Sequence, residues 1–161
     1  MNDLFNSLRV ALLGLPLAEV WRGDGSAIFC EFGNLTARKR SDGSTGHPWG
    51  EISVGLEFDW RIEKDAAIVC GSGGNRELWD AHFRRITGAT AIELSLFGTV
   101  PELSLELSTG HRLQTYSLYE DGPDWALTDR RGDEEMWVYW EDGHIICSEG
   151  THLGPQSRPL R

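Results

Sequence analysis

Four carboxylates flank one aromatic segment near the C-terminus, and they are the first candidates for chemistry. The segment is MWVYW, preceded by Glu134 and Glu135 and followed by Glu141 and Asp142. Two carboxylates on either side of a glycosidic bond, with aromatic rings to stack on the sugar, characterise glycoside hydrolases. Strand alternation favours another interpretation, in which the acids lie in turns and Trp137 and Tyr139 share one face of a strand. These six residues are therefore predicted to bind a partner rather than to catalyse a reaction.

The rest of the chain offers no pattern for a catalytic, cofactor or metal site. The five histidines lack metal-ligand spacing, and no GxSxG segment is present to hold a nucleophilic serine. The glycine-rich segment CGSGGN at 70–75 precedes a predicted helix, but it matches neither of the common phosphate-binding patterns. We therefore expect a protein that is not an enzyme and that carries no cofactor.

The charge of the chain is concentrated in one region. The formal net charge is -10, and residues 120–149 hold ten acids and two arginines, a net of -8. This distribution disfavours nucleic acid as a partner and suits a basic protein. Three cysteines without paired spacing indicate a reducing compartment. With no signal peptide and no apolar run of membrane-spanning length, we expect a cytoplasmic protein without a membrane partner.

The spacing of apolar residues predicts an α+β fold that is mainly antiparallel β. Helical spacing over 3–13 and 75–86 predicts an N-terminal helix and a helix that bridges two halves. About ten alternating segments joined by short turns predict antiparallel strands, arranged as a barrel or a sandwich. One alternating segment, 50–62, is expected to be continuous, with Phe58 and Trp60 on the same face. Residues 34–49 are polar and form an exposed loop that carries Arg38, Lys39 and Arg40.

The two halves of the chain repeat the same order of segments. Residues 14–72 resemble residues 88–148, with Gly14 matching Gly88 and Trp60 matching Trp125. We predict a single domain over 1–150 that contains this internal duplication, followed by a disordered tail over 151–161. The basic loop at 34–49 stands where the second half has the two-residue turn TG. It is therefore interpreted as an insertion into the repeated order of strands.

The stretch DWRIEKDAAIVCGSG and the later WVYWEDGHI resemble a scattered bacterial family of uncharacterised small proteins. The resemblance rests on positions that look structural: Trp60, Arg61, Ile62, Ile68, Gly71, Ser72 and Trp125. Gly73 and Gly74 stand where an Asp is expected after the Gly-Ser turn. Families of this kind are similar to the immunity-type proteins of bacterial toxin systems, which implies a small acidic domain that binds and neutralises a toxin.

Two functions follow from these observations, and the sequence leaves both open. The first is a protein-binding domain that uses the acidic 120–149 region and exposed aromatic residues against a basic partner. The second is a small-molecule-binding protein or hydrolase with a cavity between the two halves. Homodimerisation through an edge strand or through the Trp137 and Tyr139 face is also open.

Overall fold

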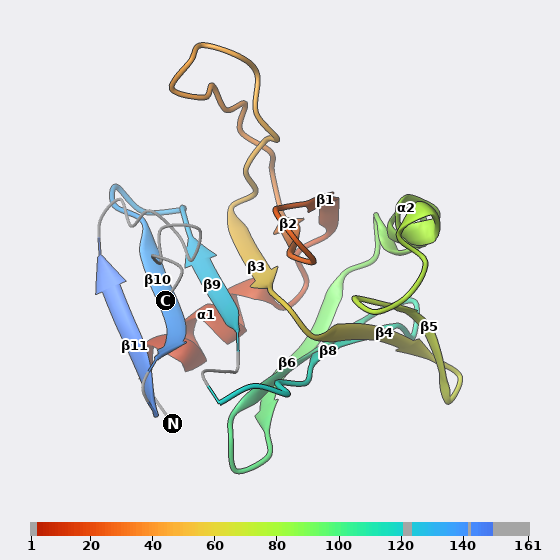
Figure 1. Ribbon diagram of the computed structural model, residues 1–161. Coiled ribbons are helices and arrows are strands. Elements are labelled where there is room, and N and C mark those ends of the chain that lie inside the picture. The colour runs from red at the N-terminus through yellow and green to blue at the C-terminus, as the bar shows by residue number, and fades with distance from the viewer. Residues whose placement is uncertain (1–2, 121–123, 142, 150–161) are drawn as a thin grey trace.

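The computed structural model describes residues 3–120, 124–141 and 143–149, and these form two antiparallel sheets (Figure 1). The six-stranded sheet has the order β1 (Leu17–Arg22), β2 (Ile28–Phe32), β3 (Ile52–Leu56), β9 (Trp125–Asp129), β10 (Met136–Glu141) and β11 (His144–Glu149). The five-stranded sheet has the order β5 (Ala67–Gly71), β4 (Trp60–Lys64), β8 (Arg112–Thr115), β7 (Glu102–Leu107) and β6 (Ala91–Phe97). The α+β prediction is confirmed, as a sandwich and not as a closed barrel.

The core lies between the sheets, because alternate residues of each strand point inward in register. One apolar row crosses the six-stranded sheet through Cys30, Val54, Leu127 and Val138. A second crosses the five-stranded sheet through Ile62, Leu113, Leu105 and Leu94. Each of these side chains is at most 1% exposed. These two rows belong to a larger apolar core, whose burial stabilises the fold by roughly 25 cal/mol for each Å² of apolar surface.

Two helices close the sandwich, at the places that the helical spacing predicted. Helix α1 (Asp3–Leu12) packs against β6, and its Phe5 ring meets Trp125 edge to face at 6.1 Å. Helix α2 (Trp79–Ile86) packs against β1 and β5 and follows a 3₁₀ turn, η1 (Arg76–Leu78). The Asn75 side chain caps this turn by accepting a hydrogen bond from Glu77 N at 3.0 Å. Among the described residues, no helix has the length and apolar character to cross a bilayer.

The two halves contribute to the structure in a reciprocal way. Strands β1–β3 continue into β9–β11 of the second half, whereas β6–β8 continue into β4 and β5 of the first half. The segments that lead into β1 and β6 contact each other reciprocally as well: Gly14 N donates to Ala91 O, and Gly88 N donates to Leu17 O, both at 2.8 Å. Internal duplication stays a prediction, and it would account for this strand order.

One predicted strand is wrong. Residues 50–62 do not form a continuous strand; β3 and β4 belong to different sheets and are joined by residues 57–59. Phe58 has φ of 52°, in the left-handed region, and its side chain is 56% exposed. The backbone turns a corner there, so the alternation that placed Phe58 on the same face as Trp60 ends at this residue.

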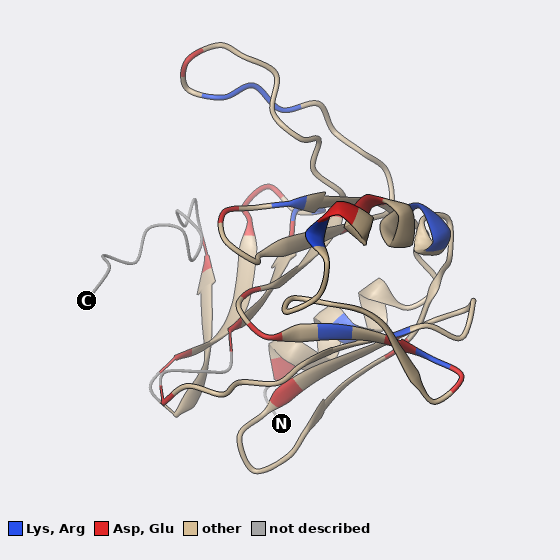
Figure 2. Cartoon of the chain, turned by 45° about the vertical axis from the view of Figure 1, so that its right-hand side comes forward, with Lys and Arg blue, Asp and Glu red and all other residues tan. Residues whose placement is uncertain are grey.

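Residues 34–49 form an arm that projects from the sandwich between β2 and β3 (Figure 1). The arm is a narrow hairpin, with Thr36 paired to Trp49 and Lys39 paired to Thr45. Basic residues lie along it and an acidic residue lies at its tip, as Figure 2 shows. The predicted tail over 151–161 lies outside the described residues.

Candidate functional site

Strand β10 places the predicted aromatic residues on the outer face of the six-stranded sheet. Trp137 lies between Thr128 of β9 and Ser148 of β11, and Tyr139 lies between Ala126 and Ile146. Both rings are half-buried. Val138, which points the other way, is fully buried in the core. Strand β10 is therefore an inner strand of the sheet, apolar on both sides.

The predicted carboxylates lie at opposite ends of β10. Glu134 is exposed in the connection before the strand, while Glu135 accepts a hydrogen bond from Arg130 Nε at 2.9 Å. Glu141 is the last residue of the strand and is half-buried, and Asp142 lies outside the described residues. Glu135 and Glu141 are six residue steps apart along extended chain, or about 20 Å. The two carboxyls of a glycosidase are at most about 9.5 Å apart, so these two cannot form such a pair.

The outer faces of the two sheets differ in chemistry at corresponding positions. Across the six-stranded sheet, one outward row is mostly apolar: Trp21, Phe29, Gly55, Ala126, Tyr139 and Ile146. Across the five-stranded sheet, the row at corresponding strand positions is polar: Ser95, Ser104, Gln114, Arg61 and Gly71. Both rows lie on antiparallel strands, so the backbone alone does not require one row to be apolar and the other polar.

A buried carboxylate, Glu31, holds the base of the arm against the six-stranded sheet. Its side chain is only 1% exposed, although it points away from the core. It accepts hydrogen bonds from Trp21 Nε1 at 2.9 Å, from Gly50 N at 2.8 Å and from the Ser53 hydroxyl. Arg130 Nη1 lies 3.8 Å from the same carboxylate. These partners supply the donors that a buried carboxylate requires.

Ring stacks continue this packing into the arm. His47 lies parallel to Trp21 with centroids 4.8 Å apart, and Trp21 stacks on Phe29 at 4.2 Å. The guanidinium carbons of Arg38 and Arg130 each lie 4.7 Å from the Trp49 ring centroid. The base of the arm therefore covers the β1–β3 part of the outer face, whereas Trp137 and Tyr139 lie on the β10 part.

Sequence reasoning did not identify Glu31 and Arg130 as partners. Alternation in the segment IFCEF predicts that Glu31 faces away from Cys30, but it cannot show that the arm covers this face. Arg130 lies 99 positions further along the chain, and only the pairing of β3 with β9 brings it near. A charged residue within an otherwise apolar strand was the one available signal.

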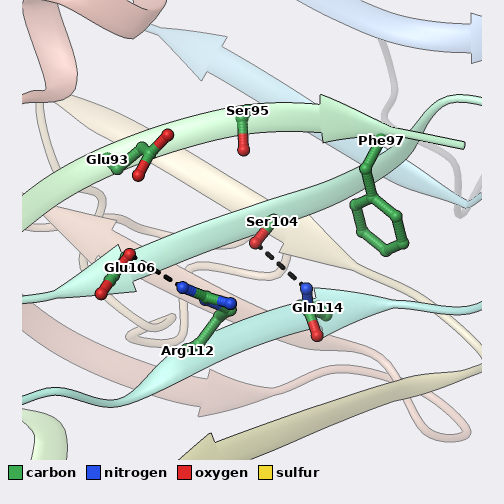
Figure 3. Close-up of a pocket in the computed structure, with 7 residues that line it drawn as sticks. All are labelled: Glu93, Ser95, Phe97, Ser104, Glu106, Arg112 and Gln114. Atoms are coloured by element: carbon green, nitrogen blue, oxygen red, sulfur yellow. Dashed lines mark hydrogen bonds and ion pairs between the residues drawn. The ribbon is translucent and has the colours of Figure 1, made fainter.

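A shallow polar groove crosses the outer face of the five-stranded sheet (Figure 3). It encloses about 280 Å³. Strands β6, β7 and β8 supply its lining side chains, which are Glu93, Ser95, Phe97, Ser104, Glu106, Arg112 and Gln114. The groove lies outside the sandwich. A cavity between the two halves stays a prediction.

Hydrogen bonds fix the orientation of the polar groups at this groove. Arg61 Nη2 donates to the Tyr116 hydroxyl at 2.6 Å, and that hydroxyl donates to Gln114 Oε1 at 2.7 Å. Gln114 Nε2 in turn donates to Ser104 Oγ at 3.3 Å. Arg112 pairs with Glu106 at 3.2 Å beside them. We call the chain from Arg61 to Ser104 the relay.

The two buried cysteines are not placed for nucleophilic chemistry. Burial raises the pKa of Cys30 strongly, and the neighbouring charge of Glu31 raises it further. Burial also raises the pKa of Cys70 to about 11. Cys147 lies on β11 and is exposed. Within the described part of the chain, no group of three His, Cys, Asp or Glu side chains is arranged to hold a metal ion.

Comparison with protein-family models, curated proteins and solved structures found no match to this chain. The resemblance to a bacterial family of small proteins therefore rests on the sequence positions given above, and the immunity type stays a prediction from the likeness between such families.

Proposed function

We propose that this chain is a non-enzymatic protein-binding domain of the immunity type, which engages a basic partner through the β10 part of the outer face. The contact surface consists of Trp137 and Tyr139 with the acidic residues at either end of β10. The observation that carries the proposal is the pair of half-buried aromatic rings at outward positions of an inner strand, next to the most acidic region of the chain.

The chemistry of this surface fits a protein partner. Tyr and Trp are enriched in the centres of protein interfaces, where they bury a large area at a small entropy cost. Acidic residues around them would increase the association rate with a basic partner and disfavour acidic ones. The corresponding outward row of the five-stranded sheet is polar and ends at Gly71 in the edge strand β5. It has no aromatic residue for the centre of a protein interface, which favours the β10 surface.

The test is a binding titration against the protein encoded by the adjacent gene, because a toxin partner is expected to be encoded there. Trp137→Ala and Tyr139→Ser should each weaken binding at least tenfold, as interface-centre truncations do. Glu134→Lys should slow association and reduce its dependence on salt.

Glu77→Lys is the matched control, since Glu77 is also exposed but lies in η1, away from β10. Equal affinity for all four variants and the unaltered protein would rule out this surface. Sedimentation of the protein alone addresses the homodimer: a monomer whose mass is unchanged by Trp137→Ala would exclude self-association through this face.

A further inference from the structure

We infer that the polar groove on the five-stranded sheet is a second binding site, for a neutral polyhydroxylated small molecule such as a single sugar ring. This site lies on the opposite sheet from β10 and is independent of the proposed function. The inference rests on the polarity of the relay, on the opposed carboxylates of Glu93 and Glu106, and on the position of Phe97.

The relay gives the groove a directed hydrogen-bond donor. It starts at a cation, Arg61, and each member donates to the next as far as Ser104. Hydrogen bonds in such a chain polarise one another and strengthen its last donor. Ser104 therefore accepts from Gln114 and keeps its own proton for a ligand. Ser95 lies directly opposite Ser104 and adds a second hydroxyl in the groove (Figure 3).

Two carboxylates provide the acceptors. Glu93 and Glu106 are paired directly across β6 and β7. Like charges at such positions are destabilising, and the ion pair that Arg112 forms in this groove is with Glu106. Hydroxyl donors from a ligand would satisfy Glu93 and relieve this repulsion. Because the groove presents strong donors and strong acceptors together, the ligand must offer both, and each sugar hydroxyl does so.

The size and shape of the groove favour a small ring. Its volume of about 280 Å³ is just under the range of roughly 300–1,000 Å³ that is usual for drug-sized ligands. Its three strands span about 10 Å at about 4.8 Å per strand spacing. Phe97 borders one side, held edge to face against Tyr116 with ring centroids 5.7 Å apart. This ring offers an apolar surface to the C–H face of a pyranose.

The charge of the groove disfavours an anionic ligand. Arg112 is already paired with Glu106, and the relay occupies Arg61, which also pairs with Glu63. Glu93 therefore leaves a net negative charge at the site. A phosphate or carboxylate ligand would meet this carboxylate beside two arginines that are already paired, whereas a neutral polyol is not repelled.

The experiment is a titration followed by backbone amide NMR of the full chain. The probes are glucose, galactose, mannose, N-acetylglucosamine, maltose and cellobiose, each at millimolar concentration. We expect at least one to cause saturable shifts confined to β6, β7 and β8, with a dissociation constant of about 1 mM. No saturable shift in these strands with any of the six probes would overturn the inference.

Variants separate ligand contacts from the relay. Glu93→Gln should weaken binding about fivefold or more, because a charged hydrogen-bond acceptor is lost. Tyr116→Phe breaks the relay without removing a groove-lining side chain, and it should weaken binding by about fivefold. Glu77→Gln, at an exposed position in η1, is the control for the loss of one exposed carboxylate and should leave the sugar titration unchanged. Shifts in β6–β8 that persist unaltered in both groove variants would also overturn the inference.

Discussion

Trp60 and Trp125 hold corresponding places in the two halves and bind corresponding turns. Trp60 Nε1 donates to the carbonyl of Ser26 at 2.6 Å, in the turn between β1 and β2. Trp125 Nε1 donates to the carbonyl of Pro101 at 2.7 Å, in the turn between β6 and β7. Because β4 and β1 belong to different sheets, as do β9 and β6, each indole ties one sheet to the other.

This relationship predicts unequal costs for replacing three buried tryptophans. Trp60→Phe and Trp125→Phe each remove a hydrogen bond and leave a carbonyl without its donor. Trp79 is equally buried, but its Nε1 has no hydrogen-bond partner among the described residues. We expect the first two variants to lose about 1–2 kcal/mol more unfolding free energy than Trp79→Phe, measured by urea denaturation. Equal losses in all three would show that these hydrogen bonds are not important for stability.

Alternation was a sufficient guide to the core but not to the connections. Cys30, Ile62 and Val138 are buried as the period of two requires, because inward positions of a sandwich strand must be apolar. The corner at Phe58 could not be predicted, since an aromatic residue at positive φ is uncommon and has no sequence signal. Local pattern thus predicted which residues face inward, but not which sheet each strand joins.

The candidate sites were less accessible to sequence reasoning than the fold. Trp137 and Tyr139 could be placed on a common face, since they are two residues apart on one strand. The groove could not be predicted, because Ser95, Ser104 and Gln114 come from three strands whose register is set by tertiary packing.

The buried carboxylate at the base of the arm leads to a second stability prediction. Three donors converge on the two oxygens of Glu31. In Glu31→Gln, the side-chain amide has only one oxygen to accept these hydrogen bonds, and its NH₂ group faces other donors. Arg130 also loses one of its two carboxylate partners. We expect a loss of about 2–4 kcal/mol in unfolding free energy. Glu134→Gln, at an exposed position, should change it by no more than about 0.5 kcal/mol. A loss for Glu31→Gln no larger than that of this control would contradict the assignment.

His111 leads to a prediction about pH. Burial lowers the pKa of this side chain below its ordinary value of 6.5, and the charge of Lys64 lowers it further. The folded state therefore favours neutral His111, whose Nδ1 lies 2.8 Å from Thr109 Oγ1. As the pH falls below the ordinary value, the unfolded chain binds the proton first, so stability is present above 6.5 and is lost below it.

Denaturation at a series of pH values checks this assignment. As the pH falls below 6.5, the unaltered protein should lose stability more steeply than His111→Gln, because the variant has no titrating side chain at position 111. Identical pH profiles for the two proteins would exclude His111 as the cause.

The arm leads to a prediction about folding: most of residues 37–48 are exposed, so we expect the sandwich to fold without them. Thr36 and Trp49 exchange two backbone hydrogen bonds, of 2.7 and 2.9 Å, so a two-residue turn can join them. Replacing residues 37–48 by Asn-Gly removes mostly exposed residues and shortens the loop, which gains about 1 kcal/mol. It also removes the stack of His47 on Trp21, a loss of roughly 0.5–1.5 kcal/mol. We therefore expect the unfolding free energy to change by no more than about 1 kcal/mol.

A single methyl group at Gly50, beside the arm, should destabilise the protein more than this replacement of twelve residues by two. A Cβ on Gly50 would lie 2.6 Å from the backbone N and O of Phe32, which belongs to a buried strand and cannot move aside. Gly50→Ala must therefore push β2 and the arm apart and break the hydrogen bond from Gly50 N to Glu31. We expect a loss of at least about 2 kcal/mol for Gly50→Ala. The opposite order of stabilities, with the shortened arm less stable than Gly50→Ala, would show that the projecting residues help to hold the sandwich together.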